Sequence, residues 1–211
     1  APAKSEDVPT VVHGVNQPEE NADIISCASC TTNCITPVVE VMSRRIGVEK
    51  AIMTTIHAYT STQGIVDGPS KKMRRGRAAA QNFVPTSTGA AKATSKALPQ
   101  LKNKFDGVAV RAPIVVGSIT DIIFVTEKDT SVEEVNNIMK EEAESDKYRG
   151  ILGVSDEGLV SSDIIGDPRA SIVDLPMTQV VAGNLVKIMS WYDNEWGYAN
   201  QMIREAIRMF K

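Results

Sequence analysis

The sequence predicts an α+β fold, because strand-like and helical patterns are mixed along the chain and some predicted strands follow one another directly. Apolar residues recur at helical spacing over residues 30–46, again from residue 131, and once more over 194–211. Residues 105–126 and 151–193 instead carry short apolar stretches rich in β-branched side chains. Consecutive strands of this kind, combined with amphipathic helices, are typical of an α+β domain.

Composition sets the class of protein. The 211 residues, 42% of them hydrophobic and 23% charged, are enough for the core of one large domain. A net charge of −3 gives no reason to expect nucleic acid or an anionic membrane as a partner. We expect a soluble, cytoplasmic protein, because residues 1–20 lack a signal-peptide pattern and no long apolar run occurs. Three cysteines within eight residues fit a reducing compartment better than a disulfide framework.

The first part of the chain leads into a helix. Residues 1–21 are polar and contain prolines, so we expect one or two short strands with loops, and residues 23–26 should form a short buried strand. A helix is predicted over residues 30–46, with Ser29 as its N-cap. Pro37 falls inside this pattern and is expected to kink the helix or to shift its start.

A strand, a loop and a helix should follow. Residues 51–58 alternate between two faces, which predicts a strand with His57 near its carboxyl end. Residues 61–87 contain several Gly and Pro residues around a basic run, which indicates a long ordered loop of the kind that is usually functional. Residues 89–101 are Ala- and Lys-rich and should be helical, and residues 105–126 should form two strands.

The last part of the chain holds two more helices. Ser131 and Glu134 form a capping box for a helix that we expect to extend to about Lys147. Its inner stripe is predicted to consist of Val132, Val135, Ile138, Met139 and Ala143. Residues 151–193 indicate several short strands. The chain closes with an amphipathic helix over residues 194–211, whose apolar stripe consists of Trp196, Ala199, Ile203, Ala206 and Phe210.

The cysteine cluster S-C-A-S-C-T-T-N-C at residues 26–34 supplies the first candidate for chemistry. Most free cysteines are small buried hydrophobic residues, but the polar surroundings of Cys30 argue against an apolar core. Its place in the first turn of a helix favours the thiolate, as an adjacent imidazolium would. Cys27 and Cys34 are assigned structural roles. A zinc or iron–sulfur site is disfavoured, because the sequence has no fourth cysteine and only two histidines.

His57 and several cationic residues could complete a site around this thiol. Sites of the α/β type gather at the carboxyl ends of strands, so a functional and a structural role for His57 are about equally supported. The basic run K-K-M-R-R-G-R at residues 71–77 is either a solvated loop or an anion site. The P-T-S-T-G run at residues 85–89 leads into a helix whose free N–H groups can also hold phosphate. Arg111, in an apolar strand, needs an anionic ligand or a buried carboxylate as its partner.

Taken together, these motifs resemble the catalytic half of phosphorylating glyceraldehyde-3-phosphate dehydrogenases. The resemblance rests on S-C-A-S-C-T-T-N-C, T-T-I-H-A-Y-T, R-R-G-R, P-T-S-T-G-A-A-K-A, V-A-V-R-A-P, V-S-S-D and S-W-Y-D-N-E-W-G-Y, which occur in that order. It extends from about residue 1 to residue 211, and the cysteine motif is highly specific. It implies a mixed or antiparallel sheet with helices on one face.

The resemblance also implies an enzyme that oxidises glyceraldehyde 3-phosphate with NAD or NADP and inorganic phosphate, giving 1,3-bisphosphoglycerate. Cys30 would attack the aldehyde, and His57 would activate the thiol and take the hydroxyl proton, so that a thioester forms. The implied ligands of the attacking phosphate are Ser29, Thr31, Thr88 and Gly89, those of the substrate phosphate are Thr60, Arg77 and Arg111, and those of the nicotinamide are Asn194 and Tyr198. The loop at 61–87 resembles one that packs between the subunits of a homotetramer.

The sequence departs from the family pattern in two places. No G-x-G-x-x-G occurs, so the chain resembles a member cut just before the last strands of an N-terminal dinucleotide-binding domain, which is missing. Residues 1–29 would then be the end of that domain, 30–193 the catalytic domain, and 194–211 a helix that would dock on the missing domain and otherwise exposes its stripe. In addition, A-P-I-V-V-G-S-I-T-D stands at residues 112–121, where many members carry a threonine and an asparagine.

Three other functions compete with this one. Erythrose-4-phosphate dehydrogenase is the nearest enzyme, although the P-T-S-T-G-A-A run favours the glyceraldehyde enzyme. A non-catalytic domain would keep the anion sites and hold sugar phosphates or a partner chain without a redox step. A redox sensor centred on Cys30 would share the activated thiol of the enzyme and therefore the same fast oxidation by peroxide. We expect no metal, nucleic acid or membrane partner.

Overall fold

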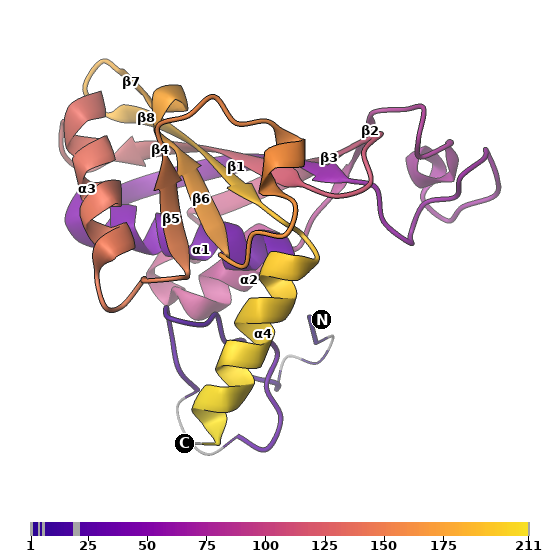
Figure 1. Cartoon of the computed structure of the whole chain (residues 1–211), viewed down its shortest axis with the longest axis horizontal. Coiled ribbons are helices and arrows are strands. Elements are labelled where there is room, and N and C mark those ends of the chain that lie inside the picture. The colour runs from indigo at the N-terminus through magenta and orange to yellow at the C-terminus, as the bar shows by residue number, and fades with distance from the viewer. Residues whose placement is uncertain (1, 4, 6, 19–21, 211) are drawn as a thin grey trace.

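The structure is a computed structural model that describes residues 2–3, 5, 7–18 and 22–210. These residues form one mixed sheet of eight strands, four α-helices and short 3-10 turns (Figure 1). The helices are α1 (Cys30–Arg45), α2 (Ala90–Ala97), α3 (Val132–Glu144) and α4 (Trp196–Met209). The strands are β1 (Val48–Ala58), β2 (Val84–Ser87), β3 (Phe105–Ala112), β4 (Ser118–Thr126), β5 (Leu152–Ser155), β6 (Ser171–Asp174), β7 (Gln179–Val181) and β8 (Leu185–Tyr192).

The sheet has the order β2-β3-β1-β4-β8-β6-β5, and β7 pairs with one end of β8. Strand β1 lies parallel to β3 and antiparallel to β4, and β5 lies parallel to β6, while the remaining neighbours are antiparallel. The register places His57 opposite Arg111 at the carboxyl ends of β1 and β3. Two side chains that the sequence suggested for one site are therefore neighbours on the sheet.

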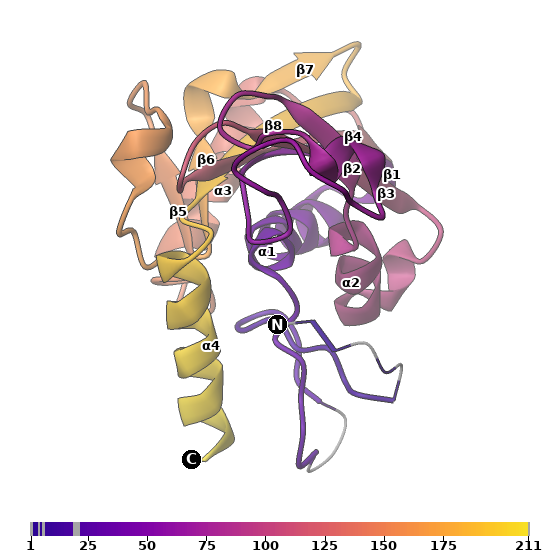
Figure 2. The same ribbon diagram turned by 90° about the vertical axis from the view of Figure 1, so that its right-hand side faces the viewer.

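Helices cover one face of the central strands and leave the other face open. The side chains of β1, β3, β4 and β8 that point toward α1 and α2 form the core with Ile35, Val38 and Met42 of α1. Figure 2 shows α1 and α2 together beneath the sheet. On the opposite face Ile52 is 59% exposed and Val108 is 52% exposed. This arrangement confirms the predicted α+β fold with a mixed sheet.

Helix α1 begins at Cys30, and its N-cap Ser29 accepts a hydrogen bond from the Thr32 N–H at 3.1 Å, as predicted. The helix runs through Pro37, which does not shift its start. Residues 31–42 are all buried, so the packing of this helix outweighs the backbone hydrogen bond that a proline removes. Tertiary contacts thus override a local signal.

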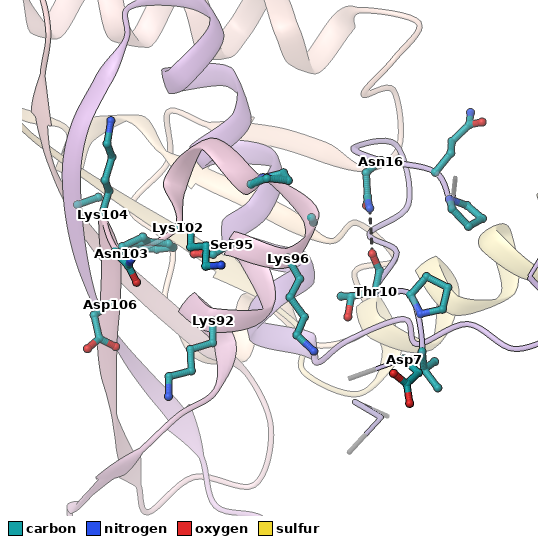
Figure 3. A pocket seen from close by; sticks show the side chains of 18 of the residues that line it. Asp7, Thr10, Asn16, Lys92, Ser95, Lys96, Lys102, Asn103, Lys104 and Asp106 are labelled. Carbon is teal, nitrogen blue, oxygen red and sulfur yellow. Dashed lines mark hydrogen bonds between the residues drawn. The ribbon is translucent and has the colours of Figure 1, made fainter. Parts of the chain in front are cut away.

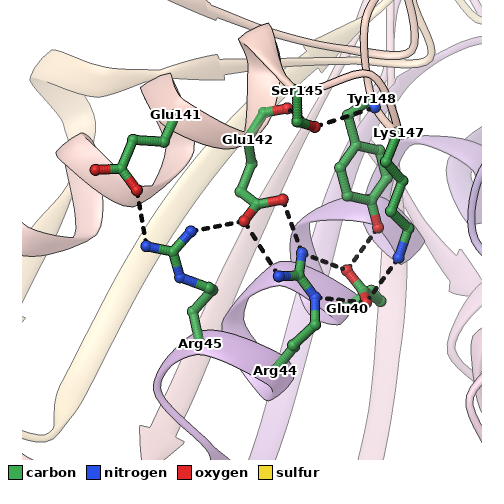
Figure 4. Close-up of polar contacts among 8 residues, drawn as sticks. All are labelled: Glu40, Arg44, Arg45, Glu141, Glu142, Ser145, Lys147 and Tyr148. Atoms are coloured by element: carbon green, nitrogen blue, oxygen red, sulfur yellow. Dashed lines mark hydrogen bonds and ion pairs between the residues drawn. The ribbon is translucent and has the colours of Figure 1, made fainter.

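An ionic network joins α1 to α3 (Figure 4). Arg44 contacts both Glu40, on its own helix, and Glu142, on α3, while Arg45 contacts Glu142 at 2.7 Å. The Tyr148 hydroxyl, fully buried, donates to Glu40 at 2.6 Å. Because each carboxylate has several donors, the burial of these charges is compensated.

Helix α3 begins as predicted, since the Ser131 side chain accepts from the Glu134 N–H at 3.1 Å. It ends at Glu144, before the predicted Lys147, because the Ser145 hydroxyl donates to the Glu142 carbonyl and closes the last turn. The buried stripe agrees with the prediction except at Val132, which stands at the exposed first position and is 40% exposed.

The largest differences from the sequence prediction lie in the segments that precede α1 and α2. The stretch before α1 pairs only through a single bridge between Thr10 and Ser26, and it does not form the expected strands within residues 7–18 and 22–29. The loop at 61–87 extends to one side of the sheet and ends in β2 (Figure 1). Part of that loop is therefore a strand that pairs with β3.

Helix α4 and the N-terminal segment extend away from the sheet side by side (Figures 1 and 2). His13 Nδ1 lies 2.8 Å from the Glu205 carboxylate, and the Tyr198 hydroxyl donates to the Ala28 carbonyl at 3.1 Å. Much of the apolar stripe of α4 is exposed, with Ile203 56% exposed and Phe210 92% exposed. Within the described residues, no helix combines the length and apolarity needed to cross a membrane.

Candidate active site

A hollow of about 530 Å³ opens where the carboxyl ends of β1 and β3 meet the N-termini of α1 and α2. The residue that precedes α4, Glu195, and its neighbour also line it. Nine of the eleven side chains or backbone positions that the sequence assigned to a site line this hollow: Ser29, Cys30, Thr31, His57, Thr60, Thr88, Gly89, Arg111 and Asn194. Arg77 and Tyr198 are not part of its lining.

Cys30 and His57 face each other in this hollow. Cys30 is the first residue of α1, and His57 is the penultimate residue of β1, with 3.4 Å between Sγ and Nε2. The His57 Nδ1–H donates to the Ala58 carbonyl at 2.7 Å. A neutral ring carries one proton, so this bond leaves Nε2 free to accept the proton of the thiol. The pair has the geometry of a nucleophile with its general base.

The electrostatics of the described residues favour the neutral form of this pair. Burial raises the pKa of the Cys30 thiol, against the opposing effects of hydrogen bonding at Thr31 and the charge of Arg111. Burial, and then the positive charge of Arg111, lowers the pKa of His57 to about 4. These directions do not favour the imidazolium that the sequence suggested as the partner of a thiolate. His57 is instead poised to act as a base.

Tyr192, on β8, contacts residues on both sides of the Cys30–His57 pair. Its hydroxyl lies 2.8 Å from Thr31 Oγ1 and 2.9 Å from Thr55 Oγ1, and its ring meets the His57 ring edge-on with 5.9 Å between centroids. Tyr192 belongs to the motif S-W-Y-D-N-E-W-G-Y, but the sequence alone predicts no role for this tyrosine. Its alternation on β8 with buried residues is the signal that would place it on the helix-covered face.

The hollow also carries donors suited to an anion. Arg111 donates to the Ala58 carbonyl at 3.3 Å, while its Nε is buried without a hydrogen-bond partner among the described residues. The N-termini of α1 and α2 add free backbone N–H groups, and an eight-residue α2 begins directly after Gly89. A guanidinium and two helix starts around one thiol form a site for oxyanions.

The arginine of the basic loop that reaches the hollow is Arg75, not Arg77 as the sequence suggested. Arg75 lines it and is held by a hydrogen bond from its Nε to Thr86 Oγ1 at 2.9 Å. Arg77 pairs instead with Asp67 at 2.9 Å on the exposed side of the loop. Arg75 lies within the 3-10 turn at Met73–Gly76, and Arg77 is the residue that follows it.

Asn194 presents a fixed amide to the hollow. Its Oδ1 accepts from the Gly117 N–H and from the Ser118 hydroxyl, both at 3.1 Å. Its Nδ2 makes no hydrogen bond within the described part of the chain and is available to a ligand that offers an acceptor. Tyr198 lies nearby on α4, with its hydroxyl directed to the Ala28 carbonyl.

A second, larger hollow differs in its chemistry from the one around Cys30. The described residues contain no group of His, Cys, Asp and Glu side chains that could hold a metal ion. A larger hollow, of about 1370 Å³, lies between the N-terminal segment and α2 (Figure 3). Its polar lining is dominated by the exposed side chains of Lys92, Lys96, Lys102 and Lys104, and it contains no cysteine or histidine. It offers no nucleophile of the kind found at Cys30.

Comparisons with known proteins agree with this geometry. Residues 29–194 match the family model described as glyceraldehyde 3-phosphate dehydrogenase, C-terminal domain. The chain is 49% identical over 206 residues to glyceraldehyde-3-phosphate dehydrogenase of Streptomyces coelicolor, covering 96% of this chain and 61% of that protein. It is 52% identical over 204 residues to the Mycolicibacterium smegmatis protein of the same name, covering 96% and 59%.

A third relative, the glyceraldehyde-3-phosphate dehydrogenase of Zymomonas mobilis, is 45% identical over 213 residues and covers 100% of this chain. The chain spans about three fifths of the length of the relatives that it matches. The matched part includes both Cys30 and His57. The chain therefore belongs to the glyceraldehyde-3-phosphate dehydrogenase family and corresponds to its C-terminal domain.

Proposed function

We propose that this chain carries the catalytic chemistry of a phosphorylating glyceraldehyde-3-phosphate dehydrogenase. Glyceraldehyde 3-phosphate would be oxidised with NAD or NADP and inorganic phosphate to 1,3-bisphosphoglycerate. The observation that carries the proposal is the Cys30–His57 pair, 3.4 Å apart, in a hollow that also contains Arg111 and two helix N-termini. Substrate and co-substrate are both anions, and they must converge on one thiol.

The reaction follows from the protonation state of the pair. His57 Nε2 accepts the Cys30 proton as Sγ adds to the aldehyde carbon, and the resulting alkoxide forms a hemithioacetal once it is protonated. A bound nicotinamide ring supplies the acceptor for hydride. His57 takes the hydroxyl proton as the hydride leaves, which gives a thioester on Cys30. Phosphate oxygen then attacks the thioester carbon, and the C–S bond breaks to release the acyl phosphate and the thiolate.

The anion sites divide between the two sides of the hollow. We assign Ser29, Thr31, Thr88 and Gly89 to the attacking phosphate, since they stand at or next to helix starts. Thr60 and Arg111 are assigned to the phosphate of the substrate, with Arg75 as the lining arginine of the basic loop. Arg77 could join them only by leaving its pair with Asp67.

The dinucleotide would be held mainly outside this chain. Asn194 would donate its free amide to the nicotinamide carboxamide, with Tyr198 packed beside the ring. We further propose that residues 1–29 are the end of a dinucleotide-binding domain, that 30–193 are the catalytic domain, and that the exposed apolar stripe of the helix at 194–211 docks on the dinucleotide-binding domain. A homotetramer in the cytoplasm is the proposed form, in keeping with three free thiols.

The experiment is turnover of glyceraldehyde 3-phosphate with NAD and phosphate, in a form of the protein that includes a dinucleotide-binding half. Cys30→Ser should abolish formation of the reduced cofactor, and His57→Asn should lower kcat by about 10²- to 10⁴-fold. Cys27→Ser is the matched control, because Cys27 is also partly buried but lies outside the hollow, and it should keep its activity. Full activity of Cys30→Ser would refute the assignment of the nucleophile.

A further inference from the structure

Ser118, the first residue of β4, is a buried side chain that no role described so far uses. It is 1% exposed, and its hydroxyl lies between two functional parts of the hollow. The Ala58 N–H donates to Ser118 Oγ at 3.2 Å, and Ser118 Oγ donates to Asn194 Oδ1 at 3.1 Å. The direction of both bonds is fixed, because a backbone N–H can only donate and the amide oxygen, which also accepts from the Gly117 N–H, can only accept.

The end of a strand ladder explains why a side chain is needed here. The antiparallel pairing of β1 with β4 ends at Ile56 and Ile119, so the Ala58 N–H has no backbone partner on β4. The Ser118 hydroxyl satisfies it. A buried N–H without a hydrogen-bond partner destabilises the folded state, so the Ser118 hydroxyl stabilises this end of the strand.

The carbonyl group of Ala58 contacts the two side chains on the other side of the hollow, His57 and Arg111. The Ala58 carbonyl accepts from His57 Nδ1 at 2.7 Å and from Arg111 at 3.3 Å. Ser118 therefore connects Asn194 to the backbone of the residue that orients the base and the cation. No other described hydrogen bond spans these two halves of the hollow through so few groups.

The second donor to Asn194 depends on a glycine. Gly117 has a φ of +90°, and a Cβ at this position would lie 2.5 Å from the Ser161 carbonyl oxygen. Only glycine adopts this turn without strain, and the turn aims the Gly117 N–H at Asn194 Oδ1. With two donors on its oxygen, the amide cannot flip without losing both bonds, so Nδ2 remains directed to a ligand.

We propose that Ser118 is a positioning residue that locks the Asn194 amide and couples it to the Ala58 peptide groups that hold His57 and Arg111. This inference rests on the proposed function. Ser118 touches neither substrate nor cofactor in it; it fixes the donor for the nicotinamide side relative to the base for the thiol side. The loss of one hydrogen bond should raise the KM for NAD about three- to tenfold in Ser118→Ala.

A double-mutant cycle with Asn194 separates positioning from a structural effect. If Ser118 acts through the amide, Ser118→Ala should leave the KM for NAD almost unchanged in an Asn194→Ala background. If Ser118→Ala raised the KM for NAD by the same factor with Asn194 present and in the Asn194→Ala variant, the proposal would be overturned. Ser190→Ala is the matched control, because Ser190 is a fully buried serine on β8 whose side chain contacts Ser171 and Cys34 and does not line the hollow. Ser190→Ala should lower the free energy of unfolding about as much as Ser118→Ala does, and it should leave the KM for NAD unchanged.

A second readout does not need turnover. The chain has two histidines, so their ring signals in NMR spectra can be assigned with a single His13 variant. Ser118→Ala should shift the His57 signal through the Ala58 peptide, whereas Ser190→Ala should not. If the form that includes a dinucleotide-binding half, with no substitution, shows no aldehyde oxidation, the proposed function fails and the NMR result alone decides on Ser118. An unshifted His57 signal in Ser118→Ala would then overturn the coupling.

Discussion

Glu205 on α4 provides a stability prediction with a defined pH dependence. Its carboxylate is 1% exposed and accepts from His13 of the N-terminal segment and from Arg208 of its own helix. The perturbation is Glu205→Gln, which preserves the shape of the side chain and removes its charge. The contact between α4 and the N-terminal segment then depends on a neutral amide.

The magnitude follows from the pKa of the carboxyl group. Burial alone would raise it, but the hydrogen bonds from His13 and Arg208 outweigh burial and lower the pKa from 4.5 to about 2. At about 1.4 kcal/mol per pKa unit, this shift corresponds to about 3 kcal/mol of folding stability. A carboxyl group whose pKa is lower in the folded state contributes that stability fully above 4.5 and loses it as pH falls toward 2.

Urea unfolding of the two proteins, at several pH values, measures this contribution. Near neutral pH, Glu205→Gln should lower the free energy of unfolding by about 3 kcal/mol, and the difference should shrink steadily below about pH 4.5. Glu157→Gln serves as the control, since Glu157 is exposed in the loop after β5 and should change little. A difference that stays constant with pH, or one below about 0.5 kcal/mol at neutral pH, would contradict the linkage.

Two further predictions concern α1 and α3. Tyr148→Phe removes the 2.6 Å hydrogen bond to Glu40, and because the acceptor is charged the loss should be about 1.5–3 kcal/mol in urea unfolding. An unchanged midpoint would mean that Arg44 and Lys147 fully replace the hydroxyl. Ser131→Ala removes the N-cap of α3 and should cost about 1 kcal/mol, or about 2–4 °C in Tm by calorimetry. Ser131→Asp should retain most of that stability, and an equal loss there would argue against capping.

The elements that the sequence predicts well are those whose signals are local. Helix α1 begins where Ser29 provides a cap, and α3 begins at Ser131 for the same reason. The Cys30–His57 contact agrees with the sequence, which places a helix start and a strand end 27 residues apart, close enough for the histidine to fold back onto the thiol. Pro37 shows the limit, since its helix persists through tertiary packing that no local rule contains.

The rest depends on geometry that spacing along the chain does not encode. Both Arg75 and Arg77 belong to the basic run, and only their contacts in the fold, with Thr86 and with Asp67, distinguish the one that reaches the hollow. Ser118 has a role because a strand ladder ends two residues short of Ala58, which no composition or period reveals. The neutral imidazole of His57 depends on burial and on the charge of Arg111, which is contributed by a different strand, whereas burial alone favours the neutral thiol of Cys30 against the effect of Arg111.

The use of main-chain groups at Ala58 has an evolutionary consequence. Every residue except proline supplies the same N–H and C=O, so a substitution at this fully buried position acts on the bonds to His57, Arg111 and Ser118 only through the fit of the new side chain. Side chains around the hollow can therefore diverge without removing these main-chain bonds. Proline, which lacks the N–H, would remove the bond to Ser118 outright.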